Sequence, residues 1–215
     1  MHAFAGTTTM GPTAPPVLTP FPNRRLCSVH PIDLVFLVDG SDSISSSNFE
    51  VVRDWVLSIV ESFLNKRRSL GVAVVQFSEE SKVEVDYRTV RNVYEIRGSL
   101  VRMTQLRMGT NPYTALRLIN SEIVQQLTPT AFKVLITLTD GTMNEDRDTE
   151  AVETARSAFH NMMSVTVGEY ENHDVSDFTK DGFNFDLDNF EDLQDTIAQI
   201  TQSVCSQIDK MYQVG

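Results

Sequence analysis

The chain has 215 residues, and its 29 acidic and 18 basic residues give a formal net charge of -11. This length fits one domain with a tail, and the acidic balance argues against nucleic acids and anionic membranes as partners, because phosphate groups bind clustered Lys and Arg. No stretch reaches the roughly 18 consecutive apolar residues of a membrane-spanning helix, so membrane insertion is not expected.

Residues 1–26 are expected to form an extended tail or linker. They are rich in Pro and Thr, most densely from Pro12 to Pro16, and such a composition buries too little apolar surface to fold. The first four residues lack the basic and apolar regions of a signal peptide, so we take the sequence for a mature fragment. The folded domain is expected to cover residues 27–208, with a C-terminal tail at 209–215.

Within the folded domain, apolar patterns predict strands that alternate with helices. The first strand, at 33–39, is continuously apolar between two carboxylates, as in a strand that is buried on both faces. Apolar runs also predict strands at 70–77 and 132–138, the segment 163–167 is expected to form a further strand, and 183–187 a short one. Helical spacing of apolar residues predicts helices at 49–63, 93–103, 112–127, 151–159 and 190–204. Ser47 and Glu50 have the spacing of a capping box at the start of the first helix.

The segment 82–87 alternates strictly between polar and apolar residues, which is typical of a half-exposed edge strand. Strands that alternate with helices predict an α/β fold with a doubly wound, mostly parallel sheet. In this fold helices cover both faces of the sheet, and the segment 82–87 supplies one antiparallel edge strand.

The residues that follow the buried strands predict a ligand site, because ligands of doubly wound sheets bind beyond the carboxyl ends of the strands. Asp39, Ser41 and Ser43 follow the first strand, and Asp140 follows the strand at 132–138. Thr110 lies in a loop before a helix. Each motif alone is more typical of a turn or a helix cap, but together they offer oxygen ligands without Cys or His. Such a set favours a hard divalent cation.

With these residues in this order, the chain resembles the von Willebrand factor A domain family. The resemblance covers roughly residues 30–208 and includes the strand end from Val75 to Ser78 and the run from Thr114 to Leu116. It implies that the chain carries that family's metal-ion-dependent adhesion site.

The resemblance also implies a role for each site residue. Ser41, Ser43 and Thr110 would supply hydroxyl ligands, whereas Asp39 and Asp140 would act mainly through metal-bound water. Neutral hydroxyls leave a cation under-neutralised, so a carboxylate from another protein can replace one of its waters. We expect Mg2+ to be preferred, with Mn2+ or Ca2+ as alternatives, and we expect binding rather than catalysis.

The expected function is adhesion to an extracellular matrix protein, with collagen as the favoured partner, by a protein secreted into the matrix. The rim beside the metal is expected to select the partner. Two residues, Pro112 and Tyr113, stand where the family usually has Thr-Gly, and this change would reshape the rim. The residues expected to contact the partner are Asp42, Asn111, Pro112, Tyr113 and Thr142. The oligomeric state stays open.

The two cysteines, Cys27 and Cys205, bracket the α/β unit. By themselves they are compatible with two free buried thiols or with a disulfide, which would imply an oxidising compartment. The flanking cysteines are similar to those of the extracellular matrix branch of the family, such as the matrilins and type VI collagen. We therefore predict a disulfide between them.

Two other functions stay open. An aspartyl-phosphate phosphatase could use Asp39, but enzymes of that type have a second Asp two residues on, where this chain has Ser41. Ser41 also lacks the glycine-flanked elbow of a hydrolase, and the four histidines lie in no catalytic motif. The second alternative is a structural matrix module that binds through its sides while its metal site is idle. The acidic residues between 145 and 150 are interpreted as a helix start rather than as a second metal site.

Overall fold

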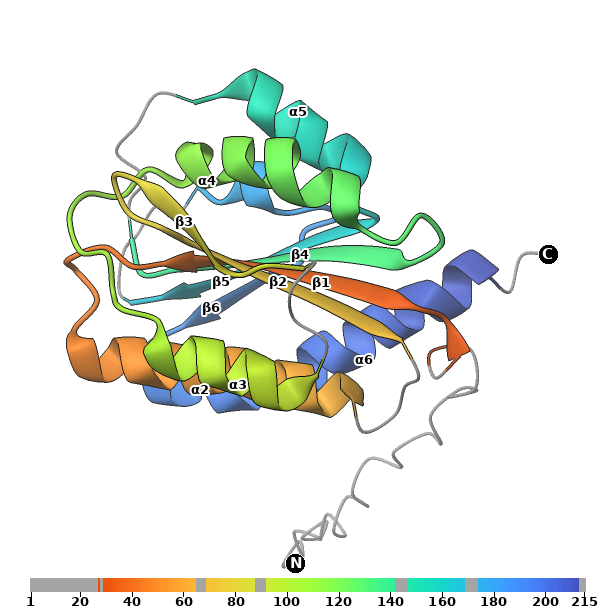
Figure 1. The fold of residues 1–215 in the computed structure, drawn as a ribbon, viewed down its shortest axis with the longest axis horizontal. Coiled ribbons are helices and arrows are strands. Elements are labelled where there is room, and N and C mark those ends of the chain that lie inside the picture. The colour runs from red at the N-terminus through yellow and green to blue at the C-terminus, as the bar shows by residue number, and fades with distance from the viewer. Residues whose placement is uncertain are drawn as a thin grey trace, which may run out of the picture.

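The computed structural model in Figure 1 describes residues 27, 29–64, 69–87, 92–141, 147–168 and 174–212. Within these residues one six-stranded sheet has the order β3-β2-β1-β4-β5-β6. The strands are β1 (Ile32–Asp39), β2 (Leu70–Phe77), β3 (Ser81–Val85), β4 (Phe132–Thr139), β5 (Asn161–Val167) and β6 (Asn184–Leu187). Neighbouring strands are parallel except β2 and β3, which are antiparallel. This confirms the predicted mostly parallel sheet with one antiparallel edge strand.

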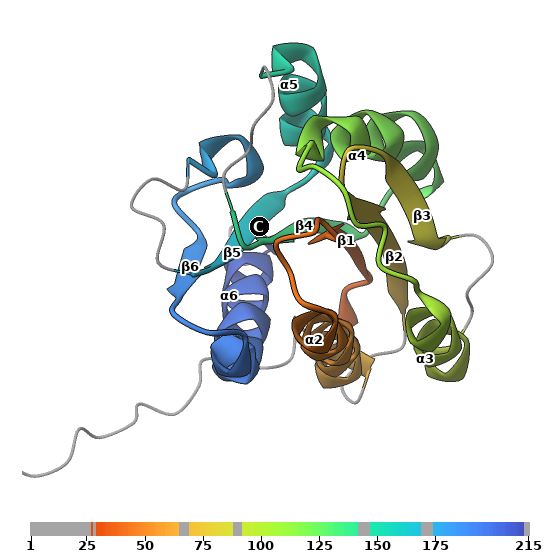
Figure 2. The ribbon, with the colours of Figure 1, turned by 90° about the vertical axis from the view of Figure 1, so that its left-hand side faces the viewer.

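Helices cover both faces of the sheet, as predicted, and Figures 1 and 2 show the three layers. On one face lie α4 (Pro112–Leu118) and α5 (Thr149–Ala158), and on the other lie α2 (Ser46–Leu64), α3 (Val93–Arg102) and α6 (Leu193–Tyr212). Short helical turns lie at Ser176–Phe178 and Phe190–Asp192. None of the described helices is long and apolar enough to cross a membrane.

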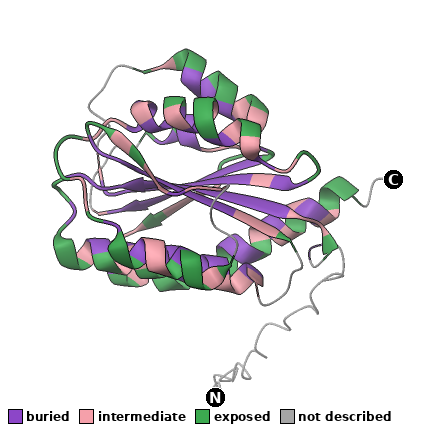
Figure 3. Ribbon diagram, viewed as in Figure 1, coloured by how far each residue is buried: buried purple, intermediate pink, exposed green. Residues whose placement is uncertain are grey.

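The sheet separates two hydrophobic cores, because alternate residues of each central strand point to opposite faces. In β1, Phe36 packs into the core beneath α2 and α6, whereas Val35 and Leu37 pack into the core beneath α4 and α5. Both faces of β1 are buried in Figure 3, which explains its continuous apolar run. The indole of Trp55 on α2 donates to the Thr196 hydroxyl on α6 at 2.9 Å, so a buried hydrogen bond joins these two helices.

Two predicted helix features differ in the structure. Helix α2 begins at Ser46, and its cap is Ser45, whose hydroxyl accepts from the Asn48 amide at 3.2 Å. The predicted capping box of Ser47 is therefore wrong; three consecutive serines offer the same capping chemistry, and the helix begins after the first of them. The predicted helix at 112–127 begins at Pro112 but continues beyond α4 as a π-helical turn and a 3-10 turn, Ile119–Ile123 and Val124–Gln126.

A disulfide joins Cys27, before β1, to Cys205 on α6, as predicted, with 5.0 Å between the two Cα atoms. Helix α6 continues to Tyr212, four residues beyond the expected domain end at 208. There the Tyr212 ring stacks on His30, with the ring centroids 3.8 Å apart. The beginning and the end of the domain are thus held together at the end of the sheet where the parallel strands begin. The expected tail at 1–26 lies outside the described residues.

Candidate metal centre

The parallel strands β1 and β4 end side by side, and the loops beyond them form one surface, which faces the viewer in Figure 2. We call this surface the crest and define it as residues 39–45, 78–80, 103–111 and 139–141. Four of the five predicted metal ligands come from the first and last of these segments, and the fifth comes from 103–111. The crest therefore collects residues that are distant in the sequence.

Asp39 is the deepest residue of the site, with 0% of its surface exposed. One carboxylate oxygen accepts from the Ser41 amide at 2.8 Å, and the other accepts from the Thr139 hydroxyl at 2.7 Å. Burial raises the pKa of Asp39 to about 6, although hydrogen bonds from Ser41 and Thr139 oppose the shift. Because both contacting groups are neutral, a nearby cation would stabilise the ionised carboxylate.

A chain of hydrogen bonds leads from the buried part of the site to its exposed part. The hydroxyls of Ser41 and Ser43 lie 2.9 Å apart, and Ser43 donates to an Asp140 carboxylate oxygen at 2.8 Å. Ser41 is buried, whereas Ser43 is exposed. The nearby charge of Asp140 contributes to the raised pKa of Asp39. The structure thus brings Asp39, Ser41, Ser43 and Asp140 together as the sequence predicts.

Thr110 reaches the same surface through a segment that we call the strap, residues 103–111. The Asp42 amide donates to the Met108 carbonyl at 3.1 Å, and the Asn111 amide donates to the Ser78 carbonyl at 2.7 Å. These bonds fix the strap on both sides of Thr110, which is half-buried. Among the described contacts, none joins the Thr110 side chain directly to the other four predicted ligands.

Two glutamines that are not among the predicted site residues hold the strap in place. Gln76 of β2 is fully buried; its side-chain oxygen accepts from the Leu106 amide at 2.7 Å, and its nitrogen donates to the Thr104 carbonyl at 3.1 Å. Gln105 donates to the Ser41 carbonyl at 2.9 Å and to the Ile44 carbonyl at 2.8 Å. A polar residue inside the apolar run of β2 was a usable signal for Gln76, but nothing in the sequence marks Gln105.

Gly40 is required directly beneath the strap. A Cβ atom at this position would lie 2.0 Å from the side-chain oxygen of Gln76, so any larger residue would displace the glutamine. The Gly40 carbonyl also accepts from the Arg107 amide at 2.8 Å. Close backbone approach, rather than a positive φ, explains this glycine.

The predicted rim residues occupy different depths. Asp42 is exposed, whereas Asn111 is half-buried. The side-chain oxygen of Asn111 accepts from the Thr114 amide at 3.4 Å and so caps α4. Pro112 and Tyr113, by contrast, are buried, so their side chains lie beneath the rim rather than on it. Thr142 lies outside the described residues.

Tyr113 is held below the crest by a polar network. Its hydroxyl donates to the buried Asp177 carboxylate at 3.0 Å, and its ring packs against Phe178 with the centroids 5.7 Å apart. Arg147 binds the same carboxylate with two nitrogens, at 2.9 and 2.5 Å. Burial and the Asp177 carboxylate raise the pKa of Tyr113 above its ordinary value. Tyr113 therefore connects the start of α4 to the segment 174–178.

The donor set of the crest fits a hard cation better than a soft one. Within the described parts of the chain, no group of three or more His, Cys, Asp or Glu residues is placed to hold a metal ion by itself. The crest instead offers two carboxylates and three hydroxyls, and oxygen ligands of this kind suit Mg2+, Mn2+ or Ca2+.

Comparison with known proteins gives a family match over most of the described chain. The family profile described as the von Willebrand factor type A domain matches residues 33–199. Matrilin-1 of Gallus gallus is 34% identical over 140 residues, which are 64% of this chain and 28% of the relative. The collagen alpha-6(VI) chain of Mus musculus is 25% identical over 185 residues, or 84% of this chain and 8% of the relative. The chain thus spans less than a third of the length of these relatives.

Solved structures show the same fold. Proximal thread matrix protein 1 from the mussel byssus superposes with a TM-score of 0.72 at 18% identity, covering 83% of this chain and 47% of that one. Another structure of that mussel protein is described as having a zinc-occupied MIDAS (metal-ion-dependent adhesion site) motif. It superposes with a TM-score of 0.71 at 19% identity, and the match covers 83% of this chain and 46% of that one.

Proposed function

Because the chain belongs to the von Willebrand factor type A domain family, we propose that it is an extracellular matrix adhesion module that binds a protein partner through a divalent cation at the crest. The observation that carries this proposal is the hydrogen-bonded cluster of Ser41, Ser43 and Asp140 beside the buried Asp39. The matrilin and collagen relatives are matrix proteins, which supports a secreted, extracellular location.

The proposed ligand roles are those that the family resemblance implies. Ser41, Ser43 and Thr110 would bind the cation through their hydroxyls, whereas Asp39 and Asp140 would hold metal-bound water. Mg2+ is the first choice, with Mn2+ and Ca2+ as alternatives. When bound, the cation would offer an electrophilic position to a carboxylate of the partner. Ser43 is exposed, so it lies on the side of the site that a partner can reach.

Fibrillar collagen is the favoured partner, because acidic side chains that recur along a rigid rod allow many weak contacts to act together. Asp42, Asn111 and Thr142 would contact it at the rim. Pro112 and Tyr113 would act from below, by fixing the path of the chain directly after Thr110 and Asn111.

We propose no catalytic role for the site. A nucleophilic Asp39 would have to reach a substrate, but its carboxylate is fully buried and both of its oxygens accept hydrogen bonds. The matrix proteins among the relatives also favour binding over catalysis.

Solid-phase binding to immobilised fibrillar collagen tests the proposal. Collagen binding by the wild type should fall in EDTA and recover when Mg2+ is added. In Mg2+, Ser41→Ala should reduce collagen binding as much as EDTA reduces it for the wild type. Ser47→Ala is the matched control, because Ser47 lies nearby on α2 and is exposed. Collagen binding that is unchanged in EDTA would contradict the metal-mediated mechanism.

One observation favours the alternative of metal-independent binding through the side of the domain. Helix α3 exposes Tyr94 and Val101, which are 81% and 70% exposed and, seven residues apart, lie on the same helix face. In that case Tyr94→Ala should reduce collagen binding and EDTA should not.

A further inference from the structure

Two adjacent strap residues have a backbone conformation that disfavours their side chains. Arg107 has a φ of 57° and Met108 a φ of 111°, in the left-handed region that L residues other than glycine rarely adopt. The next residue, Gly109, could adopt such a φ without strain, yet it is not among the positive-φ residues. The strap thus carries its strain at two residues with long side chains, and such strain concentrates at functional sites.

The surrounding contacts enforce this conformation. The Arg107 amide donates to the Gly40 carbonyl at 2.8 Å, and the Met108 carbonyl accepts from the Asp42 amide at 3.1 Å. One residue earlier, the Leu106 amide donates to the buried side chain of Gln76 at 2.7 Å. The backbone of both strained residues is therefore bonded to the loop that carries Ser41 and Ser43, which fixes where their side chains leave the crest.

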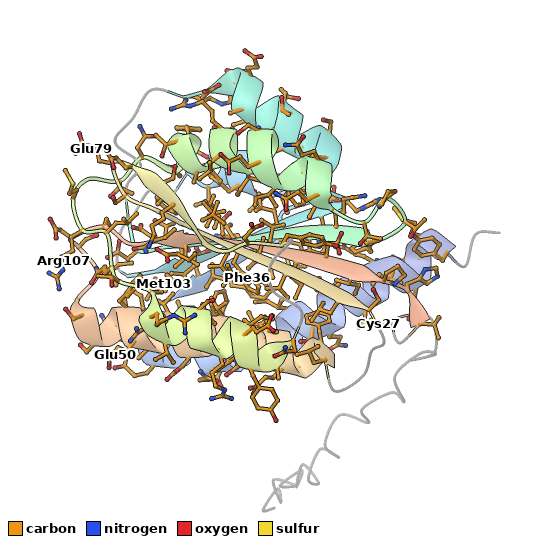
Figure 4. All side chains as sticks on the ribbon, in the orientation of Figure 1. Cys27, Phe36, Glu50, Glu79, Met103 and Arg107 are labelled. Carbon is orange, nitrogen blue, oxygen red and sulfur yellow. A yellow bond between two sulfur atoms is a disulfide. The ribbon has the colours of Figure 1, made fainter. Side chains whose placement is uncertain are left out.

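Both side chains point to solvent beside the proposed metal site. Met108 is 56% exposed, although methionine is usually buried. Arg107 projects from the crest in Figure 4, and one of its nitrogens donates to the Ser46 hydroxyl at 2.5 Å, which leaves other N–H donors for a ligand. Exposed acids flank the pair: Asp42 bonds to the Met108 backbone, and Glu79, labelled in Figure 4, lies near Gly109.

We propose that Arg107 and Met108 determine which partner binds. They would do so by contacting the partner residues that lie beside the carboxylate bound at the metal. Met108 packs against an apolar side chain, and Arg107 pairs with a second carboxylate. The partner is therefore a protein segment with two acidic residues and an apolar residue close together. This inference rests on the proposed function, because it assumes that one partner carboxylate binds at the metal.

The chemistry of the crest supports this choice of partner. An adaptable thioether on the surface favours apolar side chains of varied shape. A guanidinium binds a carboxylate through two parallel N–H bonds, and here it supplies positive charge among acidic neighbours. Because bonds to Gly40 and Asp42 fix the backbone of both residues, less backbone conformational entropy is lost when their side chains meet a partner.

An array of immobilised peptides with a central Glu and systematically varied neighbours tests the inference in Mg2+ and in EDTA. The wild type should bind in Mg2+ only, and should prefer peptides with an apolar residue and a second Asp or Glu beside the central Glu. Met108→Ala and Met108→Gly should lose the apolar preference, with binding weakened about fivefold, and Arg107→Gln should lose the acidic preference. Met211→Ala, at an exposed methionine on α6, is the control that should change neither.

Two further measurements separate recognition from structure. Met108→Gly should melt at a temperature no lower than Met108→Ala, because glycine adopts this φ without strain. Calorimetry should show wild-type Mg2+ affinity for both variants. If both preferences survive in the variants, or if Met108→Ala loses Mg2+ binding, the inference is wrong while the proposed function can stand. If no peptide binds the wild type in an Mg2+-dependent way, the proposed function fails and the inference fails with it.

Discussion

At the scale of single residues, Asp140 has the most informative position, because it connects the exposed side of the site to β4. Its carboxylate accepts from the Ser43 hydroxyl at 2.8 Å, and only 8% of the residue is exposed. In the proposed site, this carboxylate orients metal-bound water rather than binding the cation directly. Such outer contacts commonly change metal affinity about 10- to 100-fold.

Asp140→Ala should therefore weaken Mg2+ binding by about 10- to 100-fold in calorimetry. The melting temperature should change little, since the loss of the hydrogen bond from Ser43 costs only about 1 kcal/mol. Asp42→Ala removes an exposed carboxylate of the same loop and is the matched control. Equal Mg2+ affinity in Asp140→Ala would refute its assignment to the site.

A site residue could be predicted from the sequence when the end of a strand determines its position. Asp39 is the last residue of β1 and Asp140 directly follows β4; because these strands are neighbours, the proximity of the two carboxylates follows from topology. Tyr113 could not be placed in this way. Its burial depends on contacts with Asp177 and Phe178, more than 60 residues further along, and no local pattern encodes such a contact.

At the scale of elements, Asp33 connects segments at the end of the sheet opposite the crest. One oxygen accepts from the Tyr87 hydroxyl after β3 at 3.0 Å, and the other accepts from the Thr128 amide before β4 at 2.7 Å. Burial nevertheless raises the pKa of Asp33 above the ordinary 3.8. The folded protein therefore holds this proton at a pH where the unfolded chain has lost it.

This shift predicts a pH dependence of stability. Because the folded-state pKa is raised, the contribution of Asp33 is complete below about pH 4 and is lost as the pH rises through the raised pKa. In EDTA, the melting temperature of the wild type minus that of Asp33→Asn should thus decrease as the pH rises from about 4. Asp54→Asn, at an exposed aspartate of α2, is the comparison variant. A difference that does not change with pH would contradict the prediction.

Whole elements were predictable where burial imposes one pattern. In β1, the run from Leu34 to Val38 is continuously apolar because helices cover both faces of the strand, and β3 alternates because it is an edge strand. The change from α4 to a π-helical turn at Ile119 was not predictable, because Ile119, Ile123 and Leu127 keep a helical spacing and are all buried. Apolar periodicity reports which face is buried, but not which backbone hydrogen bonds form.

At the scale of the whole molecule, the disulfide encloses almost all of the described domain, because Cys27 and Cys205 are separated by 178 positions. Closing so long a loop restricts the unfolded chain and contributes about 5 kcal/mol on the chain-entropy model, with measured gains often nearer 2 to 4 kcal/mol.

Replacement of both cysteines by alanine should lower the free energy of unfolding by about 2 to 5 kcal/mol, measured by urea denaturation. Mg2+ affinity should not change, because the disulfide and the crest lie at opposite ends of the domain, as the positions of Cys27 and Arg107 in Figure 4 show. Intact-mass analysis after alkylation without a reductant supplies the control. Two alkylated thiols in the secreted wild-type protein would refute the disulfide in solution.

The position of this bond also determines how the domain would respond to mechanical tension. A pulling force that enters the chain before Cys27 and leaves it after Cys205 passes directly through the two sulfur atoms. The strands and the crest between them lie outside that load path, so they would keep their arrangement while the flanking segments are stretched. The crest would thus be mechanically insulated from strain along the polypeptide.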